Sequence, residues 1–173
     1  MEPWGARLAQ GGEAEFAEFY DACADRLHAY LAVRLGCRED AADVLQETFV
    51  RLVRNRTKLR QVDNVVAYAF TIARNEAARL AKKTSRERIK RLEASQRVAQ
   101  QASDTSQIET VELVAAALAR LVDDEREVIA LKTYGDLTFA EIAKVTKLPQ
   151  GTVATRYRAG IERLRRLLAR ELS

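Results

Sequence analysis

The sequence predicts an all-α protein made of two small helical domains joined by a flexible linker. Helix-favouring Ala, Leu, Glu and Arg are abundant, whereas the 173 residues include only seven glycines and two prolines. Apolar residues recur every three or four positions over long stretches, and no segment of any length alternates as a half-buried strand would. The domains are expected at residues 1–98 and 108–173, with the linker at 99–107.

Three helices are expected in the N-terminal domain. The first spans 14–35, where apolar residues follow helical spacing and Gly36 fits the C-terminal cap. The second spans 39–54, and its expected inner face consists of Ala41, Leu45, Thr48, Phe49, Leu52 and Val53. A polar loop over 55–64 leads into a third helix, which starts near Asp63 and ends in a basic extension.

The linker segment AQQASDTSQ (99–107) loses both charge and periodicity, so we interpret it as a linker or a frayed helix end. Beyond it, apolar spacing predicts helices at 108–122, 124–134, 138–146 and 149–171. These four helices form the C-terminal domain, which is expected to contain a helix-turn-helix.

Several function classes find no support in the residues present. The chain has no GxxxxGK, no HExxH and no nucleophile–histidine pair beyond the lone His28, so it is not expected to be an enzyme and no catalytic residues are assigned. With Cys23 and Cys37 as the only cysteines, no metal site and no cofactor are expected, and Cys23 fits a core position beside Phe19 and Leu27. Neither a signal peptide nor a membrane span of about 20 apolar residues is apparent, so we expect a cytoplasmic protein without membrane insertion.

Charge is concentrated in two separate basic blocks. Residues 74–97 carry nine basic and three acidic side chains, and residues 147–173 carry seven and two. An acidic segment precedes each block: 1–54 lies before the first, and 101–146 lies before the second. Two separated surfaces that face phosphates would give this pattern, and so would two solvated helix faces.

The strongest local motif is a helix-turn-helix that begins at Thr138. Thr138 and Glu141 fit a capping box, and Leu137 and Ile142 fit the accompanying hydrophobic staple. Lys147 stands at the turn, where Gly or Asn is usual, so we predict a positive or nearly positive φ for it. Pro149 then suits the first turn of the following helix.

The N-terminal part of that following helix is expected to enter a DNA major groove. Arginine reads guanine edges, and threonine or alanine contacts the thymine methyl group, while later arginines hold phosphates. The candidate residues are Gln150, Thr152, Ala154, Thr155, Arg156, Arg158 and Arg163. An ordinary helical hairpin with solvated arginines is the alternative.

Two stretches resemble the conserved domains of one family. Residues 118–168, which include LTFAEIA and LPQGTVATRYRAGIERLR, resemble the promoter-reading domain of the sigma-70 family, extracytoplasmic-function group. DVLQETF (43–49) resembles the DLVQETF segment of the same group, and YAFTIARN (68–75) resembles its WLxxIARN segment. The likeness covers about residues 13–171, in the order and spacing of the family.

The resemblance implies roles for residues in the N-terminal half. Core-polymerase binding falls on Asp43, Gln46, Glu47 and Val50, although a solvated helix face would also explain these residues. Recognition and melting of the minus-10 DNA fall on Asn64, Tyr68, Arg74, Asn75, Arg79, Lys82 and Lys83. The 55–64 loop is the candidate pocket for an unstacked base, and a plain connector is its alternative. Tyr68 and Arg79 depart from the family, which usually has Trp and Asp there.

The implied function is that of a sigma factor. Its partners would be core RNA polymerase and promoter DNA, both double-stranded and melted, with minus-35 recognition by the C-terminal domain. The resemblance also allows an anti-sigma factor. A stand-alone helix-turn-helix regulator is the first alternative, and a helical adaptor without DNA contact is the second.

Overall fold

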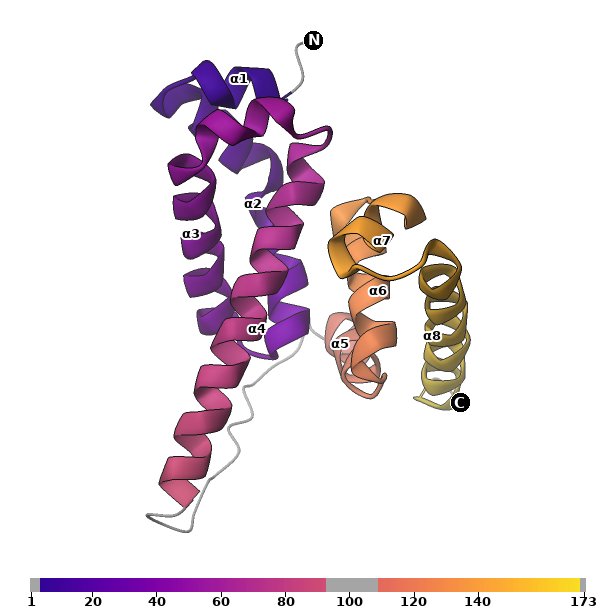
Figure 1. Ribbon diagram of the computed structural model, residues 1–173. Coiled ribbons are helices and arrows are strands. Elements are labelled where there is room, and N and C mark those ends of the chain that lie inside the picture. The colour runs from indigo at the N-terminus through magenta and orange to yellow at the C-terminus, as the bar shows by residue number, and fades with distance from the viewer. Residues whose placement is uncertain (1–3, 93–108, 172–173) are drawn as a thin grey trace.

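The computed structural model describes residues 4–92 and 109–171, which are helical and contain no strand (Figure 1). The helices, in chain order, are α1 (Trp4–Gln10), α2 (Glu13–Leu35), α3 (Arg38–Arg54), the 3-10 helix η1 (Arg56–Gln61), α4 (Val65–Leu92), α5 (Glu109–Ala119), α6 (Asp123–Gly135), α7 (Phe139–Thr146) and α8 (Gln150–Glu171). The seven predicted helices are present, while α1 and η1 were not predicted. The predicted linker at 99–107 lies outside the described residues.

The N-terminal helices α1–α4 form one bundle around the buried face of α2. Phe19, Cys23, Leu27 and Leu31 are spaced along that face and are almost fully buried. Gly36 ends α2 in the left-handed conformation, with φ 68°. The core position predicted for Cys23 is confirmed, and burial raises the pKa of its thiol to about 12.

The inner face of α3 differs from the prediction at two positions. Leu45 and Leu52 are buried as expected, but Val53 is 45% exposed and Val44, with 5% exposure, is buried. The reason is the 3.6-residue period, because Val53 lies about 100° around the helix from Leu52.

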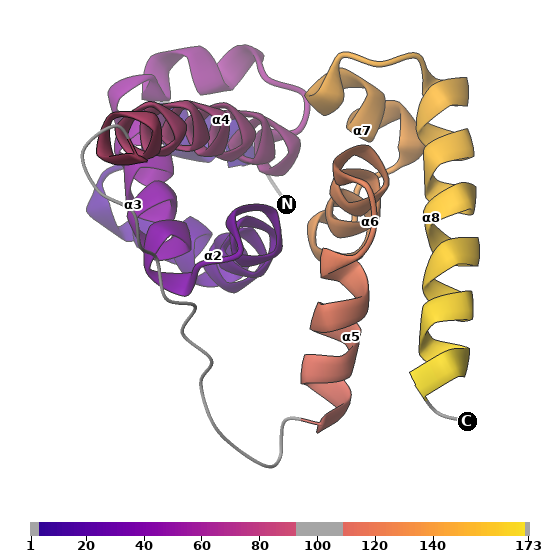
Figure 2. The same cartoon turned by 90° about the horizontal axis from the view of Figure 1, so that it is seen from below.

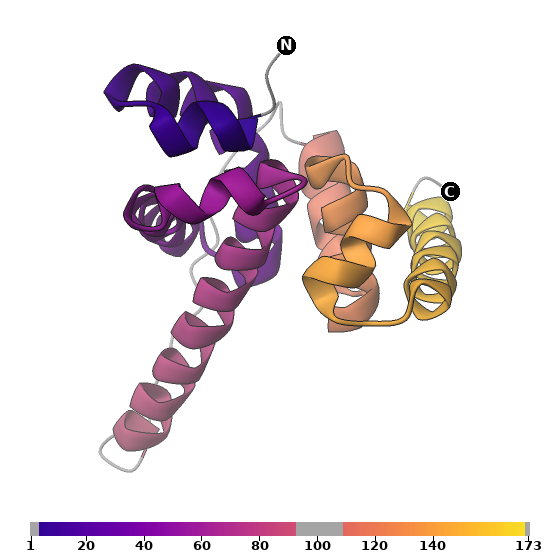
Figure 3. The same ribbon diagram turned by 45° about the horizontal axis from the view of Figure 1, so that its top comes forward.

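The long helix α4 changes character along its length. Its first half is packed in the bundle through Ala69, Phe70 and Ala73, all without exposed surface. Residues 81–90 are all exposed. This half extends past the end of the bundle (Figures 1 and 3), so its basic side chains face solvent on an unsupported helix.

The C-terminal helices α5, α6 and α7 all pack against α8 (Figure 2). A Cβ at Gly160 of α8 would lie 2.7 Å from the Cδ1 of Ile129 on α6. The absence of a side chain at Gly160 therefore lets α8 approach α6 closely.

The two sets of helices also pack against each other, chiefly through α2 and α6. One continuous cluster of buried residues includes Tyr30 and Phe70 from the first set and Leu131 and Leu137 from the second. The Arg26 side chain donates to the Tyr134 carbonyl at 2.8 Å and also to the next carbonyl, so it caps the C-terminal end of α6. None of the helices in the described ranges is long and apolar enough to cross a membrane.

Candidate DNA and polymerase interfaces

The helix-turn-helix consists of α7, a turn and α8. Thr138 accepts from the Glu141 amide at 3.2 Å, and the Glu141 carboxylate accepts from the Thr138 amide at 2.8 Å, which confirms the capping box. Lys147 lies in the left-handed region with φ 59°, as predicted. Ile142 and Val153 are fully buried at the corner between the helices. The two helices are thus packed together at this corner, and α8 starts directly after the turn.

The predicted base-reading residues of α8 differ in exposure. Gln150, Thr155 and Arg158 are exposed, whereas Thr152 and Ala154 are half-buried.

Two arginines of α8 are held by acidic residues of α6. Arg156, which is 30% exposed, pairs with Asp124 at 2.9 Å. Arg163 pairs with Glu125 at 3.2 Å. The expectation that Arg156 is an exposed reader is therefore corrected: the acidic first turn of α6 lies alongside it and holds its guanidinium.

A second basic surface lies on the solvent-facing half of α4. Asn75, Arg79, Lys82 and Lys83 are all exposed there. Arg79, Lys82 and Lys83 border a shallow hollow of about 370 Å³ together with Arg86, Glu87 and Lys90. Successive turns of one helix place these cations in a row, which suits contact with a run of phosphates.

Arg74 lies instead at the contact between the N-terminal and C-terminal helices. Its guanidinium donates twice to Glu127 of α6, at 2.8 and 3.2 Å. The Tyr30 hydroxyl also donates to this carboxylate at 3.3 Å, and Arg34 lies 3.7 Å from it. Burial disfavours the charged form of Arg74, but the bonds to Glu127 outweigh that effect and raise its pKa. We call these four residues the Glu127 cluster.

Asn64 links the start of α4 to the helix-turn-helix. Its amide donates to Glu141 at 2.6 Å, while its side-chain oxygen accepts from the Ala67 amide at 3.1 Å and so caps α4. Hydrogen bonds from the Thr138 backbone and from Asn64 lower the pKa of Glu141. Tyr68, another predicted minus-10 residue, is half-buried and packs against the core. These residues are therefore separate from the exposed cations of α4.

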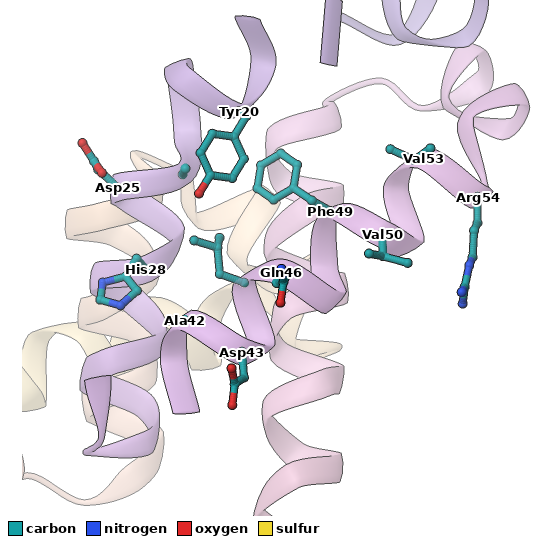
Figure 4. Close-up of a pocket in the computed structure, with 12 residues that line it drawn as sticks. Tyr20, Asp25, His28, Ala42, Asp43, Gln46, Phe49, Val50, Val53 and Arg54 are labelled. Carbon is teal, nitrogen blue, oxygen red and sulfur yellow. The ribbon is translucent and has the colours of Figure 1, made fainter. Parts of the chain in front are cut away.

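The predicted polymerase-binding residues border a groove of about 830 Å³ between α2 and α3. Asp43, Gln46 and Val50 line it, and Tyr20 and Phe49 lie together across its upper part with ring centroids 4.7 Å apart (Figure 4). The groove thus offers an apolar floor with polar groups at its edge, a combination suited to a partner helix.

Glu47 does not line this groove. It lies on the side of α3 that faces α4, where it accepts from Arg51 at 3.0 Å. Arg51 in turn pairs with Glu76 at 2.9 Å. Asp43 lines both the groove and a second hollow of about 420 Å³ between α3 and α4, which Glu47 also lines.

The acidic partners of Arg74, Arg156 and Arg163 were not predicted from the sequence. Asp124, Glu125 and Glu127 all belong to the first turns of α6, within the 101–146 segment whose acidic excess was visible. The exposed apolar side chains Tyr20 and Val53 were also missed as parts of a surface. Nothing in the spacing of either group shows which helix it would meet.

Two family profiles match separate parts of the chain. The Sigma-70 region 2 family profile matches residues 19–87, and the Sigma-70, region 4 profile matches residues 117–166. The chain is 31% identical over 169 residues to the ECF RNA polymerase sigma factor BldN of Streptomyces coelicolor, and the match covers 92% of this chain and 63% of BldN. It is 29% identical over 164 residues to the RNA polymerase sigma factor CarQ of Myxococcus xanthus, over 94% of both chains.

A solved structure shows the same fold. The sigma factor RpoE from Bartonella quintana, in complex with the anti-sigma factor NepR, superposes with a TM-score of 0.78 at 23% identity, over 91% of this chain and 98% of that chain. Both halves of the chain thus match the two regions of one family in their order. The chain belongs to the sigma-70 family of RNA polymerase sigma factors, in the extracytoplasmic-function group.

Proposed function

We propose that this chain binds core RNA polymerase and directs it to promoters that carry specific minus-35 and minus-10 elements. The groove between α2 and α3 would receive a helical part of the polymerase, with Asp43, Gln46 and Val50 at its edge and Glu47 beside it. The polymerase supplies the active site, so the chain acts as an initiation factor in the cytoplasm and performs no catalytic step of its own.

The minus-35 element would be read by the exposed start of α8. Gln150, Thr155 and Arg158 are accessible at the end of α8 that follows the turn, which is the end that enters the major groove in helix-turn-helix proteins. This packed helix-turn-helix, present together with a second basic helix, is the observation that carries the proposal.

The minus-10 element would contact α4 and η1. The exposed cations Arg79, Lys82 and Lys83 suit the phosphates of that element. Arg74 and Asn64 would join them after release from Glu127 and Glu141, because these carboxylates occupy the Nε and Nη2 donors of Arg74 and the side-chain amide of Asn64.

An anti-sigma factor is proposed as a further partner. The similar sigma factor RpoE was solved with the anti-sigma factor NepR bound, and its fold covers nearly the whole of this chain.

Transcription in vitro with purified core polymerase on a promoter library tests the proposal. Enrichment of promoters that share two spaced elements, seen only when both proteins are present, is the expected result. Footprinting with and without core polymerase separates the alternatives. Protection of a palindrome by the chain alone would instead identify a stand-alone regulator. Binding to promoter complexes that does not fall with added salt would argue for an adaptor without phosphate contacts.

A further inference from the structure

Helix α1 lies outside the residues that the family profiles match and has no part in the proposed function. The region 2 profile begins at residue 19, whereas α1 ends at Gln10. In the fold, α1 lies across η1 at one end of the N-terminal bundle (Figures 1 and 3). Two segments some 50 residues apart in sequence are thus side by side.

The contact between α1 and η1 is made backbone to backbone at Gly5. A Cβ at this position would collide with the Leu59 carbonyl oxygen and would lie 3.3 Å from the Val62 carbonyl oxygen. Only glycine therefore allows α1 to approach η1 this closely. Leu8, one turn further along α1, has no exposed surface, and neither does Leu59.

The other side of α1 is fixed to α2. The Trp4 ring meets the Phe19 ring edge-on with centroids 5.1 Å apart. The Arg7 guanidinium lies 4.5 Å above the Trp4 ring and forms an ion pair with Glu18. Helix α1 therefore contacts both α2, which belongs to the bundle core, and η1.

Helix η1 has few interactions of its own that fix its position. Leu59 is its single buried residue, and the exposed ones are Arg56, Thr57, Lys58, Arg60 and Gln61. A 3-10 helix of six residues has poor internal hydrogen bonding, and one buried leucine offsets little of the entropy lost on ordering it. Its placement depends on what packs against Leu59, and α1 supplies much of that packing.

We propose that α1 is a positioning element for η1. Through Gly5 and Leu8 it holds the exposed cations Arg56, Lys58 and Arg60 where they meet the single-stranded minus-10 DNA. Gly5 is the positioning residue, since it sets the distance between the two backbones. This inference rests on the proposed role of η1 in promoter melting.

Gly5→Ala tests the proposal in the full-length chain with core polymerase. The added methyl group must displace η1, so open-complex formation on a duplex promoter is expected to fall at least about tenfold, since a misplacement of roughly 1 Å can cost about a hundredfold. A template with a pre-melted minus-10 region should restore activity to the unaltered level. Core pull-down should be unchanged, and amide hydrogen exchange should rise in α1 and η1 but not in α2, α3 or α4.

Gly12→Ala is the matched control, because a Cβ there would meet only the Glu15 carboxylate, at 4.0 Å. It should behave as the unaltered chain on both templates. Leu8→Val is a milder second variant, which should show the same duplex-specific loss to a smaller degree if Gly5→Ala fails to fold.

Lys58→Ala separates failure of this inference from failure of the proposed function. If Lys58→Ala shows the duplex-specific defect and the α1 variants do not, the positioning role of α1 is overturned. Equal losses of the α1 variants on both templates, with a lowered Tm, would also overturn it, because α1 would then only stabilise the fold. If Lys58→Ala has no defect either, the melting role proposed for η1 fails, and the role of α1 fails with it.

Discussion

Removing the Glu127 carboxylate is expected to destabilise the whole chain. Glu127 is 5% exposed, and its carboxylate accepts from Arg74 at 2.8 and 3.2 Å and from Tyr30 at 3.3 Å. Hydrogen bonds to charged groups contribute about 1.5–3 kcal/mol, and the Tyr30 hydroxyl, buried and deprived of its acceptor, costs about 1–3 kcal/mol.

Part of that loss is recovered from water. Arg34 and Arg74 are each 27% exposed, so hydration can partly replace the carboxylate. We therefore expect Glu127→Ala to lower the free energy of unfolding by about 3 kcal/mol, at the lower end of the cost of breaking a buried pair. Glu127→Gln keeps an acceptor for Tyr30 and should cost about half as much.

Urea denaturation followed by circular dichroism measures both values from the shift in midpoint at constant slope. A double-mutant cycle with Arg74→Ala should show a coupling of about 1–2 kcal/mol, because the two side chains are in direct contact. A loss below about 0.5 kcal/mol for Glu127→Ala would show that water replaces the carboxylate. Strict additivity would show that the bond to Arg74 contributes nothing.

Three further predictions concern single positions. Lys147→Gly should leave the free energy of unfolding unchanged or raise it by up to about 1 kcal/mol in urea denaturation, because glycine adopts the left-handed conformation without strain; a loss of about 1 kcal/mol would refute this. Glu141→Gln should reduce the fall of Tm on acidification. The charged form of Glu141 stabilises the fold above its ordinary pKa of 4.5, and this contribution is lost as the pH falls through its lower folded-state pKa; parallel pH profiles would contradict it. Asp43→Lys should weaken core pull-down with an unchanged circular dichroism spectrum, whereas Glu39→Lys, which lies on the same helix outside the groove, should not. Equal binding by both variants would remove Asp43 from the interface.

The local sequence was enough to predict most of the helices and the helix-turn-helix. Capping by Thr138 and the left-handed turn at Lys147 depend on neighbouring residues, and the structure confirms both. The short helix α1 was not predicted, because seven residues carry too little periodicity to distinguish a helix from a loop.

The contacts between the two sets of helices could not be predicted in the same way. Arg74 and Glu127 are 53 positions apart, and Asn64 and Glu141 are 77 apart. A charge pattern shows that cations and anions are present, but only tertiary packing decides which of them meet. Arg74 was consequently expected on the DNA surface and is found in the Glu127 cluster.

The buried cluster shared by Tyr30, Phe70, Leu131 and Leu137 also affects recruitment to polymerase. The two sets of helices cannot separate without exposing this apolar surface to water. Some partners would bind only molecules in which the two sets of helices are separated. For such a partner, the apparent dissociation constant equals the intrinsic one divided by the fraction of molecules in the separated state. Every ~1.4 kcal/mol by which packing stabilises the joined state lowers that fraction about tenfold. Substitutions in this cluster would therefore change how much free polymerase is needed to recruit the chain, while leaving every proposed polymerase-binding and DNA-binding surface intact.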